Sequence, residues 1–245
     1  INAPSRASVY GLLTDLAAIE PPVWAGILDA YLGKLGHDVT LVDAEMEGWD
    51  AGQTAGAVDR LKPDLAVFPV YGQQPSASTQ CMPGAERVAR MLDDDIPTLC
   101  LGTHPSALPE RTLRDGSWTY VVEGEGHRTI AALLAQAWPP GTVTTIPGLW
   151  HRDALPPTKM SVTKDLEYEL PSRGFSSFDF NRYRAHNWHA FGYPSRSPYA
   201  SVQTSLGCPY KCTFCCINAP FGAAGIRFWS PENVLSQFDL LAEAS

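Results

Sequence analysis

Four of the six cysteines in this 245-residue chain fall within nine positions, in the stretch "SLGCPYKCTFCC", as Cys208, Cys212, Cys215 and Cys216. The first three have the spacing C-x3-C-x2-C, which lets three thiolates of one loop converge on a single iron–sulfur cluster. A cluster with four irons needs four ligands, so three cysteines leave one iron open to a second ligand. Adjacent side chains diverge, and we therefore expect Cys216 not to join the ligand set.

Other interpretations of these cysteines remain open. A structural zinc site normally has two pairs of ligands, and only His186 and His189, spaced H-x2-H, could supply the second pair. Packing and hydrogen bonding are the commoner roles for two such histidines. A redox pair of Cys212 and Cys215 would be expected early in a βαβ unit and would not need Cys208. Structural cysteines without a ligand are unusual at this density.

The residues in front of the cluster alternate between apolar runs and helical patterns. Strands are predicted at 1–5 (the end of a strand), 37–45, 64–72, 96–102 and 119–126. Helices are predicted at 23–35, 85–92 and 127–138. Strand and helix recurring every ~30 residues are typical of an α/β fold with a doubly wound parallel sheet. Ligands of such sheets bind beyond the carboxyl ends of the strands, where this chain is rich in Gly, Pro and Ser, as ordinary turns also are. Neither G-x-G-x-x-G nor a Walker G-K-[ST] occurs, which disfavours a dinucleotide or a nucleoside triphosphate.

The composition, with 44% hydrophobic and 18% charged residues, is that of an ordinary folded protein. A formal net charge of −8 argues against nucleic-acid binding through phosphate contacts. The sequence contains no run of 18 apolar residues and no signal-peptide pattern at its start, so neither a membrane span nor secretion is predicted. The cysteine pattern is not that of a disulfide framework, and we expect a cytoplasmic protein.

The stretch from Cys208 to Cys215, with Gly207 before it, resembles the cluster motif of the radical S-adenosylmethionine enzymes. The resemblance implies that Cys208, Cys212 and Cys215 hold a 4Fe–4S cluster whose open iron is chelated by S-adenosylmethionine. It also implies that Phe214 lies near the adenine. In that family one electron from the cluster cleaves S-adenosylmethionine to methionine and a 5′-deoxyadenosyl radical, which abstracts hydrogen from the substrate.

The front of the chain is similar, piece by piece, to the cobalamin-binding domain of the cobalamin-dependent members of that family. The similar pieces are "NAPS" at 2–5, "GHDVTLVDAE" at 36–45, "PDLAVFPV" at 63–70, "LGTHPSALPE" at 101–110 and "VVEGEG" at 121–126. The resemblance implies cobalamin contacts at the strand ends, namely Ser5, Val70, Tyr71, Gly72, Gly102, Thr103, His104, Pro105, Glu123, Gly124 and Glu125. No D-x-H-x-x-G motif is present, so no histidine ligand to cobalt is assigned.

Three parts are therefore expected. A cobalamin-binding-like, Rossmann-like α/β domain covers 1–140, a connecting segment covers 141–198, and the start of a partial (β/α) radical S-adenosylmethionine barrel covers 199–245. The last part is predicted as a strand at 199–207, the cluster loop, and a helix that Ser230 caps. Because the chain begins with Ile and holds only one βα unit of the barrel, we expect an N-terminal fragment that is inactive by itself.

The resemblance implies a methyltransferase that acts on an unactivated carbon, with methylcobalamin as the methyl donor. The alternatives are a radical cyclase or oxidative enzyme of the same architecture, a non-catalytic corrinoid-binding module, and a zinc-stabilised interaction protein. The implied partners are a small-molecule or lipid-like substrate and an external one-electron donor such as ferredoxin or flavodoxin.

Overall fold

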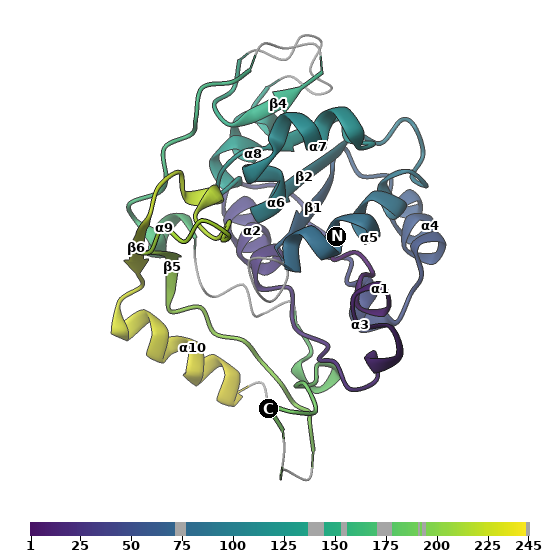
Figure 1. Cartoon of the computed structure of the whole chain (residues 1–245), viewed down its shortest axis with the longest axis vertical. Coiled ribbons are helices and arrows are strands. Elements are labelled where there is room, and N and C mark those ends of the chain that lie inside the picture. The colour runs from purple at the N-terminus through teal and green to yellow at the C-terminus, as the bar shows by residue number, and fades with distance from the viewer. Residues whose placement is uncertain are drawn as a thin grey trace.

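A four-stranded sheet lies at the centre of the molecule (Figure 1). The computed structural model describes residues 1–71, 77–136, 145–152, 156–170, 178–190, 192 and 195–243. The strands of the sheet are β1 (Ala66–Val70), β2 (Thr98–Gly102), β3 (Tyr120–Val122) and β4 (Leu149–His151), in that order. β1, β2 and β3 run parallel, and they correspond to the strands predicted at 64–72, 96–102 and 119–126.

β4 pairs antiparallel with β3 and comes from the segment that the sequence predicted as a connection. Tyr120 lies opposite His151, and Val122 lies opposite Leu149. The stretch 141–198 therefore contributes an edge strand to the sheet. Two short β-like pieces are predicted in this connection, at 142–146 and 148–153. The second contains β4, and residues 142–144 of the first lie outside the described residues.

The strands predicted at 1–5 and 37–45 do not form regular strands, and this expectation was wrong. A single parallel bridge joins Asn2 to Asp43, and the amino group of Ile1 donates to the Val67 carbonyl oxygen at 2.7 Å. Pairing stops early because Pro4 has no N–H to donate and because Asp43 caps the short helix α3 (Ala44–Glu47) through the Met46 N–H. The segment 1–3 nevertheless lies between residues 42–43 and β1.

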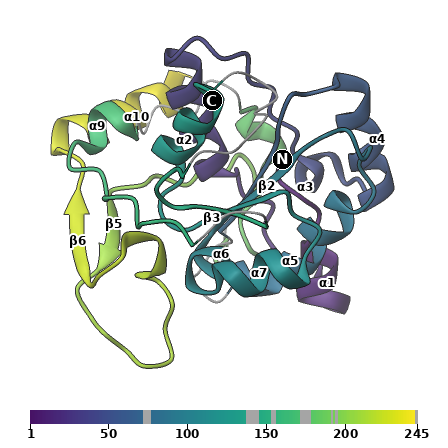
Figure 2. The same cartoon turned by 90° about the horizontal axis from the view of Figure 1, so that it is seen from above.

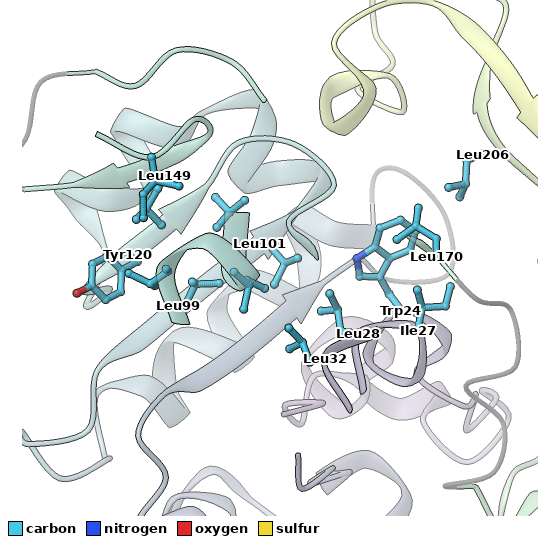
Figure 3. Packing of buried hydrophobic residues seen from close by; sticks show 14 of the residues in the cluster. Trp24, Ile27, Leu28, Leu32, Leu99, Leu101, Tyr120, Leu149, Leu170 and Leu206 are labelled. Atoms are coloured by element: carbon cyan, nitrogen blue, oxygen red, sulfur yellow. The ribbon is translucent and has the colours of Figure 1, made fainter. Parts of the chain in front are cut away.

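Helices cover both faces of the sheet, which confirms the predicted doubly wound architecture. The helices that pack on the two faces are α2 (Val23–Lys34), α4 (Ala51–Leu61), α5 (Ala77–Ala89), α7 (Pro109–Asp115) and α8 (His127–Leu134). From above, α2 lies on one side of β2 and β3, while α5 and α7 lie on the other (Figure 2). Alternate side chains of a strand point to opposite faces. Leu99 and Leu101 of β2 pack with residues of α2 and α8 (Figure 3). Cys100 lies on the other face and packs with α4, α5 and α7.

Short helices complete the described part of the chain: α1 (Arg6–Tyr10), α6 (Thr103–Ala107) and α9 (Leu166–Glu169), and the 3-10 turns η1 (Gly11–Leu13), η2 (Phe180–Arg182) and η3 (Ala219–Phe221). None of the helices that these residues form is long and apolar enough to cross a membrane.

The cluster motif lies on a separate two-stranded antiparallel hairpin, formed by β5 (Ser205–Cys208) and β6 (Gly225–Phe228). The helix α10 (Pro231–Glu243) follows β6, and the Ser230 hydroxyl accepts the Asn233 N–H at 3.1 Å, as the predicted N-cap requires. The sequence predicted one strand, the cluster loop and a helix here, and it missed the second strand, β6. The predicted strand at 199–207 is also shorter, and Cys208 is its last residue instead of the first of the loop.

Gly102 ends β2 with a φ of 141°, a conformation that favours glycine. A Cβ at this position would collide with the carbonyl oxygen of Val70 on the neighbouring strand. Gly102→Ala is therefore expected to lower the free energy of unfolding by about 3 kcal/mol, from backbone strain and displaced β1–β2 pairing. Chemical denaturation would measure this. Gly33→Ala is the matched control, because a Cβ there meets open space in α2, and that variant should be unchanged or more stable by up to about 1 kcal/mol. Equal stability of Gly102→Ala and the wild type would contradict the close approach.

Candidate functional site

A cavity of about 900 Å³ opens at the carboxyl ends of the parallel strands. It is lined by Asn2 and Ser5 on one side and by Val70, Tyr71 and Thr103 at the ends of β1 and β2. The segment 1–3 contacts residues 42–43 on one side and β1 on the other. The next segment along the chain therefore lies on one side of it and the one after that on the other, so the strand order reverses at this point. Open α/β sheets bind their ligands in the crevice at such a point.

The opposite wall of the cavity comes from the cluster hairpin. Ser205, Leu206 and Gly207 of β5 line it, together with Ile217 and Phe221 from the loop between β5 and β6. Gly207 has a φ of 89°, and a Cβ there would collide with the Gly225 carbonyl oxygen of β6, so glycine lets the two strands approach just before Cys208. A ligand in the cavity would therefore touch both the sheet and the strand that carries the first cluster cysteine.

Four of the residues predicted to contact cobalamin line this cavity: Ser5, Val70, Tyr71 and Thr103. Glu45 holds Ser5 in place, because its carboxylate accepts the backbone N–H groups of Ser5 and Arg6 and also the Ser5 hydroxyl at 3.1 Å. Gly72 lies outside the described residues.

The other predicted contacts lie near the carboxyl edge but do not line the cavity. They are Gly102, His104, Pro105, Glu123, Gly124 and Glu125. The His104 ring is 2.9 Å from the Thr79 hydroxyl, and burial lowers its pKa. Gly124 donates its N–H to the Ser106 hydroxyl at 3.1 Å. Glu123 accepts from the Trp150 indole at 3.1 Å and pairs with Lys159 at 3.0 Å.

The three predicted cluster ligands follow the cavity-lining residues of β5 but do not line the cavity themselves. Cys208 is half-buried, and its N–H donates to the Asn218 side chain at 3.0 Å, whereas Cys212 and Cys215 are exposed. Among the residues that the structure describes, no three His, Cys, Asp or Glu side chains gather closely enough for a metal site. Phe214 is 92% exposed. Cys216 is half-buried, and burial raises the pKa of its thiol.

His186 and His189 line the cavity and do not lie with the cysteines. The His186 ring accepts the Ala18 N–H at 3.0 Å and stacks on Trp188 with ring centroids 4.2 Å apart. These contacts are the packing and hydrogen bonding that the sequence favoured for the pair.

Several cavity residues were missed by the sequence analysis. Glu20, Trp24 and Glu45 line the cavity, as does Phe221. Glu20 and Trp24 belong to no motif, and their only signal is that they flank the start of the predicted helix 23–35. Glu45 ends the piece "GHDVTLVDAE" at 36–45, which could have drawn attention to it.

Glu20 is a largely buried carboxyl in this wall, 3.4 Å from the Tyr199 hydroxyl. Burial raises its pKa from 4.5 to about 7. The unfolded chain thus loses this proton before the folded protein does, and stability falls as the pH rises from about 4.5 to 7. Glu20→Gln removes the free-energy cost of ionising this buried carboxyl. We therefore expect the variant to be about 2 kcal/mol more stable than the wild type at pH 8 and equally stable at pH 4.5. Urea unfolding of both proteins across this range tests the prediction, and parallel curves would contradict it.

The parallel sheet, the reversal of strand order and the cavity at that point define an α/β ligand-binding domain. Residues 10–134, about half of the chain, match the B12 binding domain family. The chain belongs to this family.

Relatives and a solved structure extend the similarity past the sheet. An uncharacterised methyltransferase of Pyrococcus horikoshii is 25% identical over 224 residues, which cover 86% of this chain and 44% of the relative. The anaerobic magnesium-protoporphyrin IX monomethyl ester cyclase of Rubrivivax gelatinosus is 25% identical over 259 residues, covering 94% and 40%. The chain thus spans less than half the length of these relatives.

The fold resembles that of part of a solved enzyme. The radical S-adenosylmethionine methyltransferase TsrM of Kitasatospora setae, with cobalamin and a 4Fe–4S cluster bound, has a TM-score of 0.56 at 17% identity, and the match covers 92% of this chain and 43% of TsrM. Together, these similarities confirm the resemblance to cobalamin-dependent radical S-adenosylmethionine enzymes that the motifs indicated.

Proposed function

We propose that this chain binds cobalamin in the cavity and a 4Fe–4S cluster on Cys208, Cys212 and Cys215, as part of a radical S-adenosylmethionine methyltransferase acting on an unactivated carbon. One observation carries the proposal: a single cavity has the carboxyl edge of a B12 binding domain as one wall and the base of the cysteine hairpin as the other. The two cofactors would therefore share one reaction space.

The residues of the chain suit these cofactors. The cavity volume of about 900 Å³ is at the upper end for small-molecule sites, as a large cofactor requires. Ser5, Val70, Tyr71 and Thr103 would contact cobalamin directly, and the remaining strand-end residues would support them. Three thiols on a solvent-facing loop can reach one cluster with little displacement of the core, and Phe214 would then lie beside S-adenosylmethionine.

When bound, the cluster supplies the electron that cleaves S-adenosylmethionine to a 5′-deoxyadenosyl radical, and cobalamin supplies the methyl group. The protein's own part would be to hold cobalamin at the sheet side of the cavity and the cluster on the loop that follows the cavity-lining residues of β5. An external one-electron donor such as ferredoxin or flavodoxin, in a reducing cytoplasm, would be needed. The substrate would be a small or lipid-like molecule.

A second candidate is a radical cyclase of the same architecture. The similarity to the ester cyclase of Rubrivivax gelatinosus favours it, since that match covers 94% of this chain. The two candidates share all the cofactor sites named above and differ in the reaction, which substrate trials with the full-length protein would separate.

The test is to load the two cofactors separately. Hydroxocobalamin binding is measured by equilibrium dialysis, and iron content is measured after anaerobic reconstitution with iron and sulfide. We expect one cobalamin and about four irons per chain. Cobalamin without iron would indicate a non-catalytic corrinoid carrier, and iron without cobalamin would indicate a radical enzyme that has lost this cofactor. A colourless protein with one zinc would overturn the proposal.

A further inference from the structure

Glu125 is a buried carboxylate that does not line the cavity. It lies in the loop after β3, at the carboxyl edge of the sheet, and its side chain is 4% exposed. One of its oxygens accepts from Arg227 Nη2 at 2.5 Å, and the other accepts the Thr163 N–H at 2.8 Å. Arg227 Nη1 also donates to the Thr163 carbonyl oxygen at 2.7 Å, so the three residues form a closed set of hydrogen bonds.

Arg227 belongs to the cluster hairpin. It lies on β6 opposite Leu206 of β5. This pair is two residues along the ladder from Cys208 and Gly225, the last pair before the motif loop. Its guanidinium also lies over the ring of Phe221, 5.3 Å from the ring centroid, and Phe221 lines the cavity. The ion pair therefore joins the sheet, the hairpin and the cavity wall.

The pair is poorly explained by stability alone. The free energy of removing two charges from water cancels much of the free energy of their attraction. An apolar pair of similar size often stabilises a protein as much. Hydrogen bonds between a carboxylate and a guanidinium are directional, however, and they define one orientation of the hairpin. Leu206 of β5 also packs on the core, as does Trp229, which follows β6 and donates its indole N–H to the carbonyl oxygens of Leu166 and Leu170.

We propose that Glu125 and Arg227 are positioning residues that hold the β5–β6 hairpin, and with it Cys208, against the cavity. The inference rests on the proposed function, because this ion pair would help to set the distance between the two cofactors. It also assigns to Glu125 a role other than the direct cobalamin contact that its motif implied. The role concerns this chain's own contacts and can be measured with no cofactor bound.

The experiment follows the alkylation of single thiols in the whole chain by mass spectrometry, with iodoacetamide and no cofactor added. Glu125→Gln keeps the size of the side chain but removes its charge, and Arg227→Met keeps the aliphatic stem. Both variants are expected to raise the alkylation rate of Cys208 by about tenfold, because the hairpin opens more often. Arg227→Lys, which retains the charge, should restore part of the protection.

Glu123→Gln is the matched control. Glu123 lies two residues from Glu125 and pairs with Lys159, which is 74% exposed and not part of the hairpin. This variant should leave the rate at Cys208 unchanged. Cys100, which is buried in the sheet, reports global unfolding and should stay protected in every variant.

Two results would overturn the inference. One is a Cys208 rate in Glu125→Gln equal to that of the wild type. The other is an equal rise at Cys208 and Cys100, which would show general destabilisation instead of release of the hairpin. Failure of the proposed function would give a different result. The wild type would bind neither iron nor hydroxocobalamin, but the alkylation rate of Cys208 would still depend on Glu125 and Arg227.

Discussion

Replacing Cys208, Cys212 or Cys215 by alanine is expected to reduce the iron of the reconstituted protein from about four atoms per chain to background. Each of these cysteines would be one of only three protein ligands, so the loss of any one leaves two irons of the cluster without a protein thiolate. Iron and sulfide assays, together with the loss of brown colour, measure the effect.

Cys216→Ala is the internal control for this series. Cys216 adjoins Cys215 in the sequence, and adjacent side chains diverge, so we do not expect both thiols to reach one cluster. We expect this variant to keep its iron. Loss of iron in Cys216→Ala with retention in Cys208→Ala would mean that the ligand set has been assigned wrongly. Zinc bound in place of iron would favour a structural site.

Ser205→Trp is expected to weaken hydroxocobalamin binding at least about tenfold, by filling the cavity from the hairpin side. Ser205 lies on β5, well beyond the residues that match the B12 binding domain family. An effect at this position would therefore show that the hairpin forms part of the cobalamin site. Equilibrium dialysis measures the dissociation constant.

Thr204→Trp adds the same side chain at the adjacent position. Thr204 is exposed and does not line the cavity, as expected from the alternation of side chains along an extended chain. We expect binding within about twofold of the wild type in this control. If the two variants bind equally well, cobalamin does not occupy the space between the sheet and the hairpin.

Elements with a strong local pattern were predicted well. The helix at 23–35 agrees with α2 within one residue at its end, and three of the predicted strands correspond to β1, β2 and β3. In these segments the apolar period directly reflects burial, because each element packs on the core along its full length. The stretch 37–45 has a similar pattern, yet it forms only one bridge, since Asp43 starts a helix there.

Elements whose stability comes from distant partners were missed. β6 is only four residues long and mostly exposed, so its pattern does not reflect burial, and it exists because β5 pairs with it. The pairing of β4 with β3 depends in the same way on a neighbour about 30 residues away in the sequence. Glu125 shows the same limit at the site, because its partner Arg227 is 102 residues distant and no spacing links the two.

The sequence by itself determined the cysteine motif, the parallel α/β class and the family resemblance, because each depends on residue types at short, regular separations. Only the tertiary structure decided that four of the predicted strand-end residues share one cavity, that the hairpin forms its second wall, and that Glu125 pairs with Arg227. These features arise where segments far apart in the chain meet, and contacts of that kind depend on packing that local periodicity does not encode.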